Sequence, residues 1–355
     1  MVMLAEDYDY VIGGDPDRDT VDLAVLDTGS GRVHAHLADT ADGAGYRRML
    51  AWAGEHAPGR RIWALEGTCS FAAGLVVFLT EAGETVVEVG ALKRSRGAKS
   101  DRIDAIRAAR QALSREEQGA PRSGGLREAL RMVFACREGV LISRTKAVNE
   151  LKSLIVVAPE QLRAQLRGRS LTVQLTRIEA LPIQSAASVE HRLSVFSLQS
   201  IAARVRFLSA QLAELDPQLL DLIKAHPAGP ALLTEPGVGP VVAAQLLISW
   251  SHHGRVRNEA AFASLAGVAP LETSSGQSSR HRLNRGGDRA LNRALHTVAI
   301  TRMRCHPETR SYELRRSAEG KTHRDIRRSV KRALARRLYR RIESAVRLQN
   351  TLAGA

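Results

Sequence analysis

The chain has 355 residues, of which 44% are hydrophobic and 25% charged, so it has the composition of a folded globular protein with more than one domain. It contains no run of about eighteen apolar residues, which excludes a membrane span of the usual kind. Three scattered cysteines argue against a disulfide framework, and the acidic N-terminus is unlike a signal peptide. These features predict a cytoplasmic protein.

The charge is unevenly distributed along the chain. Lys and Arg number 52 against 37 Asp and Glu, a formal net charge of +15. Residues 1–60 carry 11 acids and 5 bases, a net of −6, whereas residues 301–347 carry 16 bases and 5 acids, a net of +11. The basic tail predicts contact with phosphates, although charge alone does not separate DNA, RNA and anionic membrane. The alternative is a merely solvated surface.

The first third of the chain alternates between strand and helix patterns. Strands are expected at 10–12 (running into a turn at 13–15), 21–26, 32–37, 61–65 and 85–89, and helices at 71–81 and 101–113. Three meandering strands followed by strands joined by helices imply a mixed α/β sheet. That order predicts an RNase H-like (RuvC-like) domain over residues 1–118.

A Gly/Pro/Ser break at 119–125 precedes a helical region expected over residues 126–224. Its apolar residues form a heptad-like ladder: Leu126, Leu130, Val133, Val140, Ala147, Leu151 and Leu154. Arg137 and Arg144 interrupt this ladder and are candidate nucleic-acid contacts. A second long helix is expected from Ala187 to Leu215, stopping before Pro217. The two helices predict an antiparallel hairpin or coiled-coil arm, with a plain helical core as the alternative.

A mainly helical C-terminal domain is expected over residues 227–348. Helices are predicted at 241–248, 259–267, 288–303 and 324–348, with a polar, Gly-rich loop at 272–287. Gly237 and Gly239 precede the first of these helices, as in helix–hairpin–helix elements, where glycine lets the backbone approach a phosphate. A tight inter-helix turn is the alternative.

Four acidic residues are candidate metal ligands. Asp15 lies at the end of the first predicted strand and Glu66 follows a later one, while Asp101 and Asp104 share a helix face. Converging carboxylates suit Mg²⁺ or Mn²⁺, and a two-metal clamp would support phosphoryl transfer. Taken singly, each is more often a cap or a surface residue.

Three other interpretations of the acidic segments are weaker. Residues 15–19 mimic the start of an EF-hand, but Thr20 and Leu26 stand where that loop needs Gly and Glu. The Asp27-Thr28-Gly29 sequence mimics an aspartic protease loop, which would need a homodimer. A Gly-Gly-Asp strand before a hairpin also suits an actin-like sugar kinase, although no later nucleotide loop follows.

The polar loop offers hydroxyl nucleophiles. Residues 273–282 contain several serines beside Arg280 and Arg282. A serine can attack a phosphodiester if a base or a metal activates it and cations steady the developing charge. A solvated Ser-rich loop is the alternative.

An ordered set of motifs resembles the insertion sequence 110 family of transposases. The N-terminal ones are Gly14-Asp15-Pro16, Leu65-Glu66-Gly67 and residues 99–105, and the C-terminal ones are residues 236–240, 265–270, 274–276 and 282–288. The resemblance implies a RuvC-like nuclease domain, a helical arm and a transposase domain that carries a nucleophilic serine. The family's four acidic residues fall on Asp15, Glu66, Asp101 and Asp104.

The same resemblance implies the site and the partners. The nucleophile falls on Ser275, with Ser274 as the close alternative, and the family's basic position falls on Arg285. Asp17 and Asn292 depart from the residues frequent in the family. A DNA transposase or site-specific recombinase is implied, bacterial and associated with the nucleoid, guided by an element-encoded RNA and acting as a dimer or tetramer. The alternatives are a Holliday-junction endonuclease that uses water and a non-catalytic protein that binds RNA and DNA.

Overall fold

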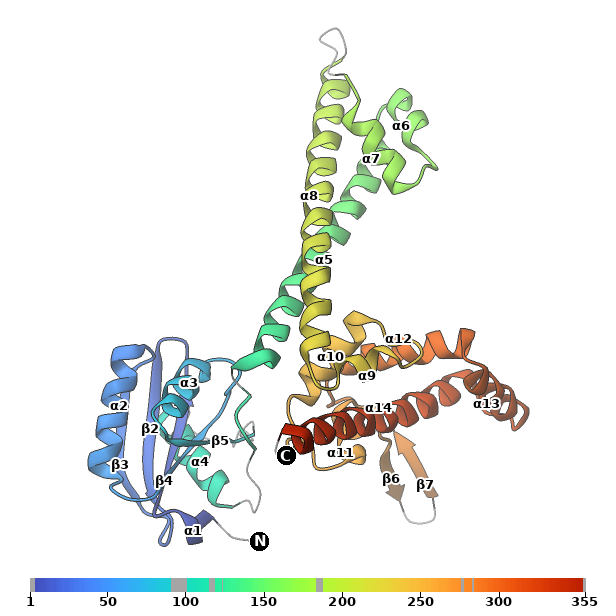
Figure 1. Ribbon diagram of the computed structural model, residues 1–355. Helices are drawn as coiled ribbons and strands as arrows, with labels where there is room; N and C mark the ends of the chain where they lie inside the picture. Colours follow the sequence, from blue (N-terminus) through green and yellow to red (C-terminus); the bar gives the residue numbers. More distant parts are fainter. Residues whose placement is uncertain are drawn as a thin grey trace.

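The computed structural model describes residues 4–90, 101–114, 119–122, 124–182, 188–275, 278–282 and 284–353. They form three parts: an N-terminal domain built around a sheet, a projecting arm of long helices, and a helical C-terminal module (Figure 1). Within these ranges, no helix is both long enough and apolar enough to span a bilayer.

The N-terminal sheet has five strands in the order β3-β2-β1-β4-β5. They are β1 (Tyr10–Pro16), β2 (Thr20–Asp27), β3 (Val33–Thr40), β4 (Arg61–Leu65) and β5 (Thr85–Glu88). The first three strands are antiparallel, and β4 and β5 extend the sheet in parallel from β1. This arrangement confirms the predicted RNase H-like fold. The turn expected at 13–15 was wrong, because β1 continues through these residues and pairs with β2 up to Pro16.

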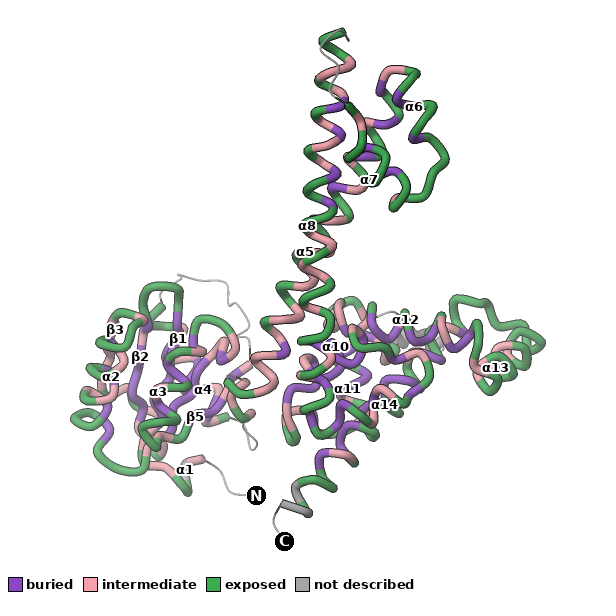
Figure 2. The backbone as a smooth tube through the Cα atoms, turned by 45° about the horizontal axis from the view of Figure 1, so that its top comes forward, coloured by how far each residue is buried: buried purple, intermediate pink, exposed green. Residues whose placement is uncertain are grey.

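Helices cover both faces of the sheet. α2 (Gly43–His56) and α3 (Ala73–Glu81) pack with Ile12, Trp63 and Leu65 in the core of one face. α4 (Asp101–Leu113) lies over the other face, and the short α1 (Leu4–Asp7) touches it. The buried residues consequently form two layers on either side of the strands (Figure 2).

The contact between α4 and β1 is unusually close because both surfaces are small. The buried face of α4 consists of Ala105, Ala108, Ala109 and Ala112. It lies directly on Gly13, where an added Cβ would fall 2.1 Å from the carbonyl oxygen of Ala105 and 2.5 Å from the backbone nitrogen of Ala109. Only glycine fits this position, and the first turn of α4 is thereby held beside the end of β1.

The arm is an antiparallel pair of long helices, α5 (Gly125–Val157) and α8 (Val189–Ala225), joined through α6 (Glu160–Leu166) and α7 (Leu171–Glu179) (Figure 1). The predicted stop before Pro217 was wrong, since α8 continues through this proline for two further turns. Leu219 and Ile223 beyond it are buried in the C-terminal core, and this burial outweighs the roughly 3 kcal/mol cost of an interior proline.

The C-terminal module packs around α10 (Pro240–Trp250), whose Trp250 is almost fully buried. The other helices are α9 (Gly229–Leu233), α11 (Glu259–Leu265), α12 (Arg289–Cys305), α13 (Pro307–Ala318) and α14 (His323–Ala353). The loop predicted at 272–287 was partly wrong, because it contains an antiparallel hairpin of β6 (Leu271–Ser275) and β7 (Ser278–Arg282). This hairpin projects from the module below α14 (Figure 1).

We expect Gly13→Ala to lower the free energy of unfolding by about 1–3 kcal/mol, because the new methyl group forces α4 off the sheet. Gly54→Ala is the matched control. Gly54 lies on the exposed side of α2 with nothing within 4 Å of an added Cβ, so alanine there should stabilise by about 0.5–1 kcal/mol. Chemical denaturation of both variants checks the opposite signs, and equal effects would contradict this account of the α4 contact.

Candidate active site and nucleic-acid interface

Asp15 is the centre of an acidic edge at the end of β1. Its carboxyl group is half-buried, and burial is the largest cause that raises its pKa, to about 6. Repulsion by Asp104, Asp101 and Glu66 raises this pKa further, in that order. The structure thus brings all four predicted carboxylates into one electrostatic field, although they come from β1, the end of β4 and α4. We call these four residues the acidic edge.

Two of these acids belong to the first turn of α4. Asp101 is exposed, whereas Asp104 is partly buried and its Oδ1 accepts a hydrogen bond from Arg107 Nη1 at 2.6 Å. Acidic residues in the first turn also interact favourably with the helix dipole. The packing of α4 on Gly13 therefore determines how near these two carboxylates come to Asp15.

Glu66 is positioned by the turn that follows β4. Gly67 adopts a positive φ of 65°, and the next residue, Thr68, is completely buried. The Thr68 hydroxyl oxygen accepts a hydrogen bond from the backbone N–H of Arg122 at 3.1 Å. The turn that carries Glu66 is thus anchored to the segment leading into the arm.

The donor set of the acidic edge suits Mg²⁺ or Mn²⁺, since it consists of carboxylate oxygens. In the part of the chain that the structure describes, however, no three His, Cys, Asp or Glu side chains already stand in the arrangement of a metal site. Burial raises the pKa of Asp15 most, and repulsion by the neighbouring carboxylates raises it further. A bound divalent cation would relieve this repulsion, so the residues fit such an ion in kind.

Asp22 is a fifth acid near Asp15, which the sequence analysis did not single out. It is the cross-strand partner of Asp15 and also raises the pKa of that residue. His36 Nε2 lies 3.1 Å from Asp22 Oδ1. Alternation along β2 and β3 could show only which residues of each strand share a face, because the pair also depends on the register between the two strands.

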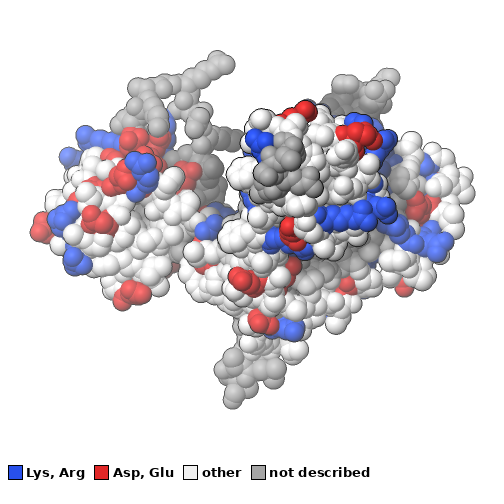
Figure 3. Space-filling view, turned by 90° about the horizontal axis from the view of Figure 1, so that it is seen from above, with Lys and Arg blue, Asp and Glu red and all other residues white. Residues whose placement is uncertain are grey.

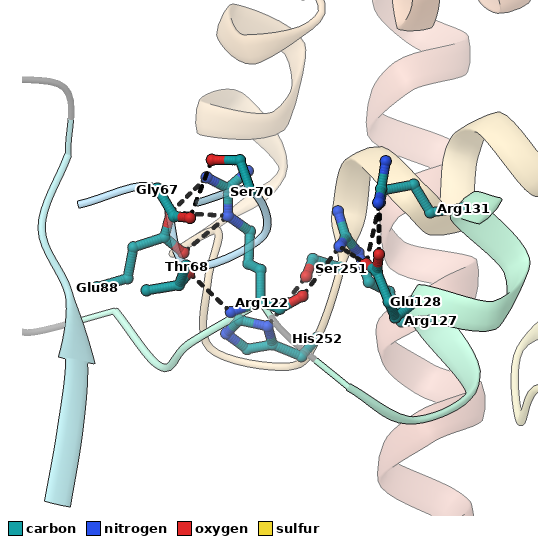
Figure 4. A network of polar contacts seen from close by, with 10 residues as sticks. All are labelled: Gly67, Thr68, Ser70, Glu88, Arg122, Arg127, Glu128, Arg131, Ser251 and His252. Atoms are coloured by element: carbon teal, nitrogen blue, oxygen red, sulfur yellow. Dashed lines mark hydrogen bonds and ion pairs between the residues drawn. The ribbon is translucent and has the colours of Figure 1, made fainter. Parts of the chain in front are cut away.

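A polar network joins the N-terminal domain to the arm (Figure 4). Arg122 Nε donates to Glu88 Oε2 at 2.7 Å at the end of β5, and the backbone oxygen of Arg122 accepts from Arg127 Nη1 in α5 at 2.9 Å. His252, in the loop after α10, lies close enough for its pKa to be lowered by burial and by nearby arginines, Arg255 first. The linker predicted at 119–125 is consequently tied to structure at residues 119–122.

We call the hairpin of β6 and β7 the serine hairpin. Parts of two motifs noted in the sequence, residues 265–270 and 282–288, lie at its base. Ser275 pairs with Ser278 and Ser274 with Ser279 across the hairpin, while the side chains of 272–281 lie outside the described residues. Below them Gly287 packs on Gly267, where an added Cβ would come within 2.4 Å of the Gly267 nitrogen. The segments 265–267 and 285–288 therefore form one compact base that orients the hairpin.

The remaining predicted contacts fall in different places. Arg282 and Arg285 are exposed beside the hairpin base, and Arg280 lies in β7. Gly237 adopts a positive φ of 81° and packs against α12, whereas Gly239 is exposed before α10. The tight-turn interpretation thus accounts for Gly237.

Arg137 and Arg144 lie between the two helices of the arm. Arg137 Nε donates to Asp216 at 2.5 Å, and Arg144 Nε donates to the Ser209 hydroxyl at 2.7 Å. Both partners belong to α8, and the Arg137 side chain is only 13% exposed. These two arginines therefore pair α5 with α8 in this structure.

Both bodies of the molecule carry acidic and basic side chains on the face seen from above (Figure 3). Seen from above, red and blue side chains are mixed on the N-terminal domain, and a run of blue crosses the other body, which also carries scattered red side chains (Figure 3). The protein thus combines an RNase H-like sheet that carries an acidic edge with a basic helical module. This combination defines the class to which the protein belongs.

Comparison with known proteins identifies the family. A model of the transposase IS116/IS110/IS902 family matches residues 229–314, and a transposase model of the DEDD IS110 type matches residues 12–158. The chain belongs to this family of transposases, which confirms the resemblance seen in its sequence.

Two curated relatives come from insertion elements. The chain is 38% identical over 125 residues to an uncharacterized 43.6 kDa protein of IS110 from Streptomyces coelicolor, an alignment that covers 35% of this chain and 31% of that protein. It is 26% identical over 318 residues to an uncharacterized 42 kDa protein of IS900 from Mycobacterium paratuberculosis, covering 75% and 78%. The match thus spans under a third of the first relative and most of the second.

We expect Asp15→Asn to change the pH dependence of stability. A folded-state pKa near 6, above the ordinary value of 3.8, means that the Asp15 contribution is fully present below about pH 3.8 and lost as the pH rises through 6. The variant should therefore gain in melting temperature relative to the wild type between pH 4 and pH 7. Asp17→Asn, which removes a neighbouring exposed carboxylate, should not.

Addition of Mg²⁺ or Mn²⁺ at pH 7.5 should raise the melting temperature of the wild type by about 2 °C or more, since a ligand that binds only the folded state stabilises it. Asp15→Asn should lose most of this shift, and Asp17→Asn should retain it. Equal shifts in all three proteins would place the ion elsewhere.

Proposed function

We propose that the protein is a DNA transposase and site-specific recombinase that cuts and rejoins DNA through a serine–DNA linkage. The observation that carries the proposal is the gathering of three carboxylates, Asp104, Asp101 and Glu66, around a fourth, Asp15. Membership of a transposase family supports DNA as the substrate. The guide RNA and the dimeric or tetrameric assembly rest on the family resemblance alone.

In the proposed reaction, Ser275 supplies the nucleophile. The Ser275 hydroxyl loses its proton as its oxygen forms a bond to phosphorus. The bond from phosphorus to one deoxyribose oxygen breaks, and that oxygen takes up a proton and leaves as a hydroxyl group. Rejoining reverses these steps with a different strand. Arg282 and Arg285 beside the hairpin would steady the charge that develops on the phosphate oxygens.

The acidic edge would hold Mg²⁺ or Mn²⁺ through Asp15, Glu66, Asp101 and Asp104. Such an ion neutralises phosphate charge and positions the scissile group when bound. The carboxylates would hold the ion in place, and the half-buried position of Asp15 would limit competition from water. Without a counter-cation, this negative edge would repel a DNA strand.

The acids and the serines belong to separate parts of the molecule. The acidic edge lies in the N-terminal domain, whereas the hairpin projects from the C-terminal module (Figure 1). A composite site assembled between two protomers would bring them together on one DNA strand, and this favours action as a dimer or higher oligomer.

Ser275→Ala should abolish the covalent protein–DNA adduct, because the attacking oxygen is removed. Denaturing gel electrophoresis of labelled element-end DNA measures the adduct, and Ser279→Ala is the control on the opposite strand of the hairpin. An adduct that persists in Ser275→Ala but is lost in Ser274→Ala would assign the nucleophile to Ser274. Full cutting without any adduct would instead favour a Holliday-junction endonuclease that uses water.

Glu66→Gln should lower the cutting rate at least about 100-fold while DNA affinity stays within about threefold, since a phosphoryl-transfer site loses several kcal/mol with a metal ligand. Rates with labelled DNA and affinities by fluorescence anisotropy give the two quantities. A variant as active as the wild type would favour the non-catalytic binding protein.

A further inference from the structure

A cleft of about 890 Å³ lies between α12 and α14 beside the hairpin base. Its described lining carries many cations and no carboxylate, Phe, Tyr or Trp. Six of the cations that line the cleft are used in the argument below: Arg285, Arg289, Arg293, Arg324, Arg327 and Lys331. We call this the cationic cleft.

The arginines near the C-terminal end of α14 differ from those at the cleft in their ion pairs. Towards the C-terminus, Arg336 and Arg340 pair with Glu259, while Arg337 and Arg341 approach Glu235. At the cleft, neither Arg324 nor Arg327 forms an ion pair with any carboxylate that the structure describes. Arg324 and Arg327 thus face the cleft without a carboxylate partner in the described structure, whereas Arg328 of the same lining pairs with Asp325 at 3.4 Å.

On the facing wall, Arg293 Nη2 lies 3.8 Å from Glu138 Oε2, but the two other arginines have no such partner in the part of the chain that the structure describes. Arg289 is the first residue of α12 and has no ion pair among the described residues, and Arg285 just before it also lacks one. A cation in the first helical turn opposes the helix dipole at a cost of about 0.3–1 kcal/mol. The placement of Arg289 therefore does not serve the stability of α12.

The cations of the cleft also repel one another. Burial is the main cause that lowers the pKa of Lys331, and Arg327 and Arg328 lower it further. The pKa of His296 is lowered by burial and then by Lys331 and Arg327. Lys331 Nζ donates to Asn292 Oδ1 at 2.8 Å, which fixes its ammonium group at the cleft wall. A polyanion in the cleft would relieve this repulsion.

We propose that the cationic cleft binds the sugar–phosphate backbone of the DNA strand on which the serine hairpin acts. This inference rests on the proposed function, because it assigns the strand to DNA. Phosphate contacts explain a lining of cations, whereas readout of single-stranded bases would call for aromatic stacking surfaces, which the described lining lacks. The cleft therefore positions the strand without reading its sequence.

The position of the cleft supports DNA as the occupant. Asn284, Arg285 and Gly287 form one rim of the cleft and directly follow β7, the second strand of the serine hairpin. A neighbouring hollow on the other side of Gly267 contains Arg282 from the end of β7. A strand in the cleft is consequently led past the base of the hairpin.

The test is the salt dependence of DNA binding by the full-length protein. The double variant Arg289→Gln/Arg324→Gln removes one exposed cation from each wall. Arg340→Gln/Arg347→Gln is the control with the same change of charge. In this control variant, Glu259 still pairs with Arg336 and Glu343 still pairs with His253, so neither carboxylate loses its last partner.

Binding of labelled duplex DNA of random sequence would be followed by anisotropy from 50 to 300 mM salt. Each lost phosphate contact lowers the slope of log affinity against log salt by about 0.9. We expect the cleft variant to lose about 2 from this slope and to bind about tenfold or more weakly near 0.1 M salt. The control variant should match the wild type, and neither melting temperature should fall.

Two results would overturn the proposal: a cleft variant with the slope of the wild type, or a slope lost for RNA of the same sequence but retained for DNA. If the cleft variant fails to fold, Arg324→Gln alone should lower the slope by about 1. The adduct assay separates this proposal from the proposed function. A persistent adduct in both serine variants, together with a reduced slope here, would sink the serine mechanism and leave the cleft assignment standing.

Discussion

The close approach of α4 to β1 at Gly13 is the contact on which the acidic edge depends. A backbone with no side chain meets a helix face made only of alanine, so the two elements come nearer than larger residues would allow. Two carboxylates on the first turn of that helix are then held beside a third at the strand end. The three carboxylates repel one another, and apolar packing elsewhere in the domain, where Ile12, Trp63 and Leu65 are buried, offsets the cost of this repulsion.

Much of this could be predicted from the sequence. The strand patterns gave the sheet and its class because alternation and β-branched runs are local signals, and the four acids stood at recognisable ends of elements. The helix α13 was missed because it buries none of its residues, and α8 was ended too early because the packing of Leu219 and Ile223 is a tertiary effect. The pairing of Asp22 with His36 depends on register across two strands, which periodicity alone does not fix.

The acidic N-terminal part and the basic C-terminal part of the chain use their charged side chains differently. In the N-terminal domain, the acids that matter are few and oppose one another at close range. In the C-terminal module, four of the nine arginines of α14 pair with or approach Glu235 and Glu259, and Arg302 pairs with Glu235 at 2.7 Å where both are buried. A count of charges in the basic tail therefore overstates its capacity for phosphate. Only the cations without carboxylate partners in the described structure contribute fully to such an interface.

The anchoring of Arg122 has a mechanical consequence. Its backbone N–H holds the turn after Glu66, and its carbonyl holds the first turn of α5, a helix of 33 residues that extends about 50 Å. The arm is thus anchored two residues beyond Glu66, a carboxylate of the acidic edge. A tilt of the arm would therefore be transmitted to the turn that follows Glu66 through the backbone N–H and carbonyl of one residue, Arg122.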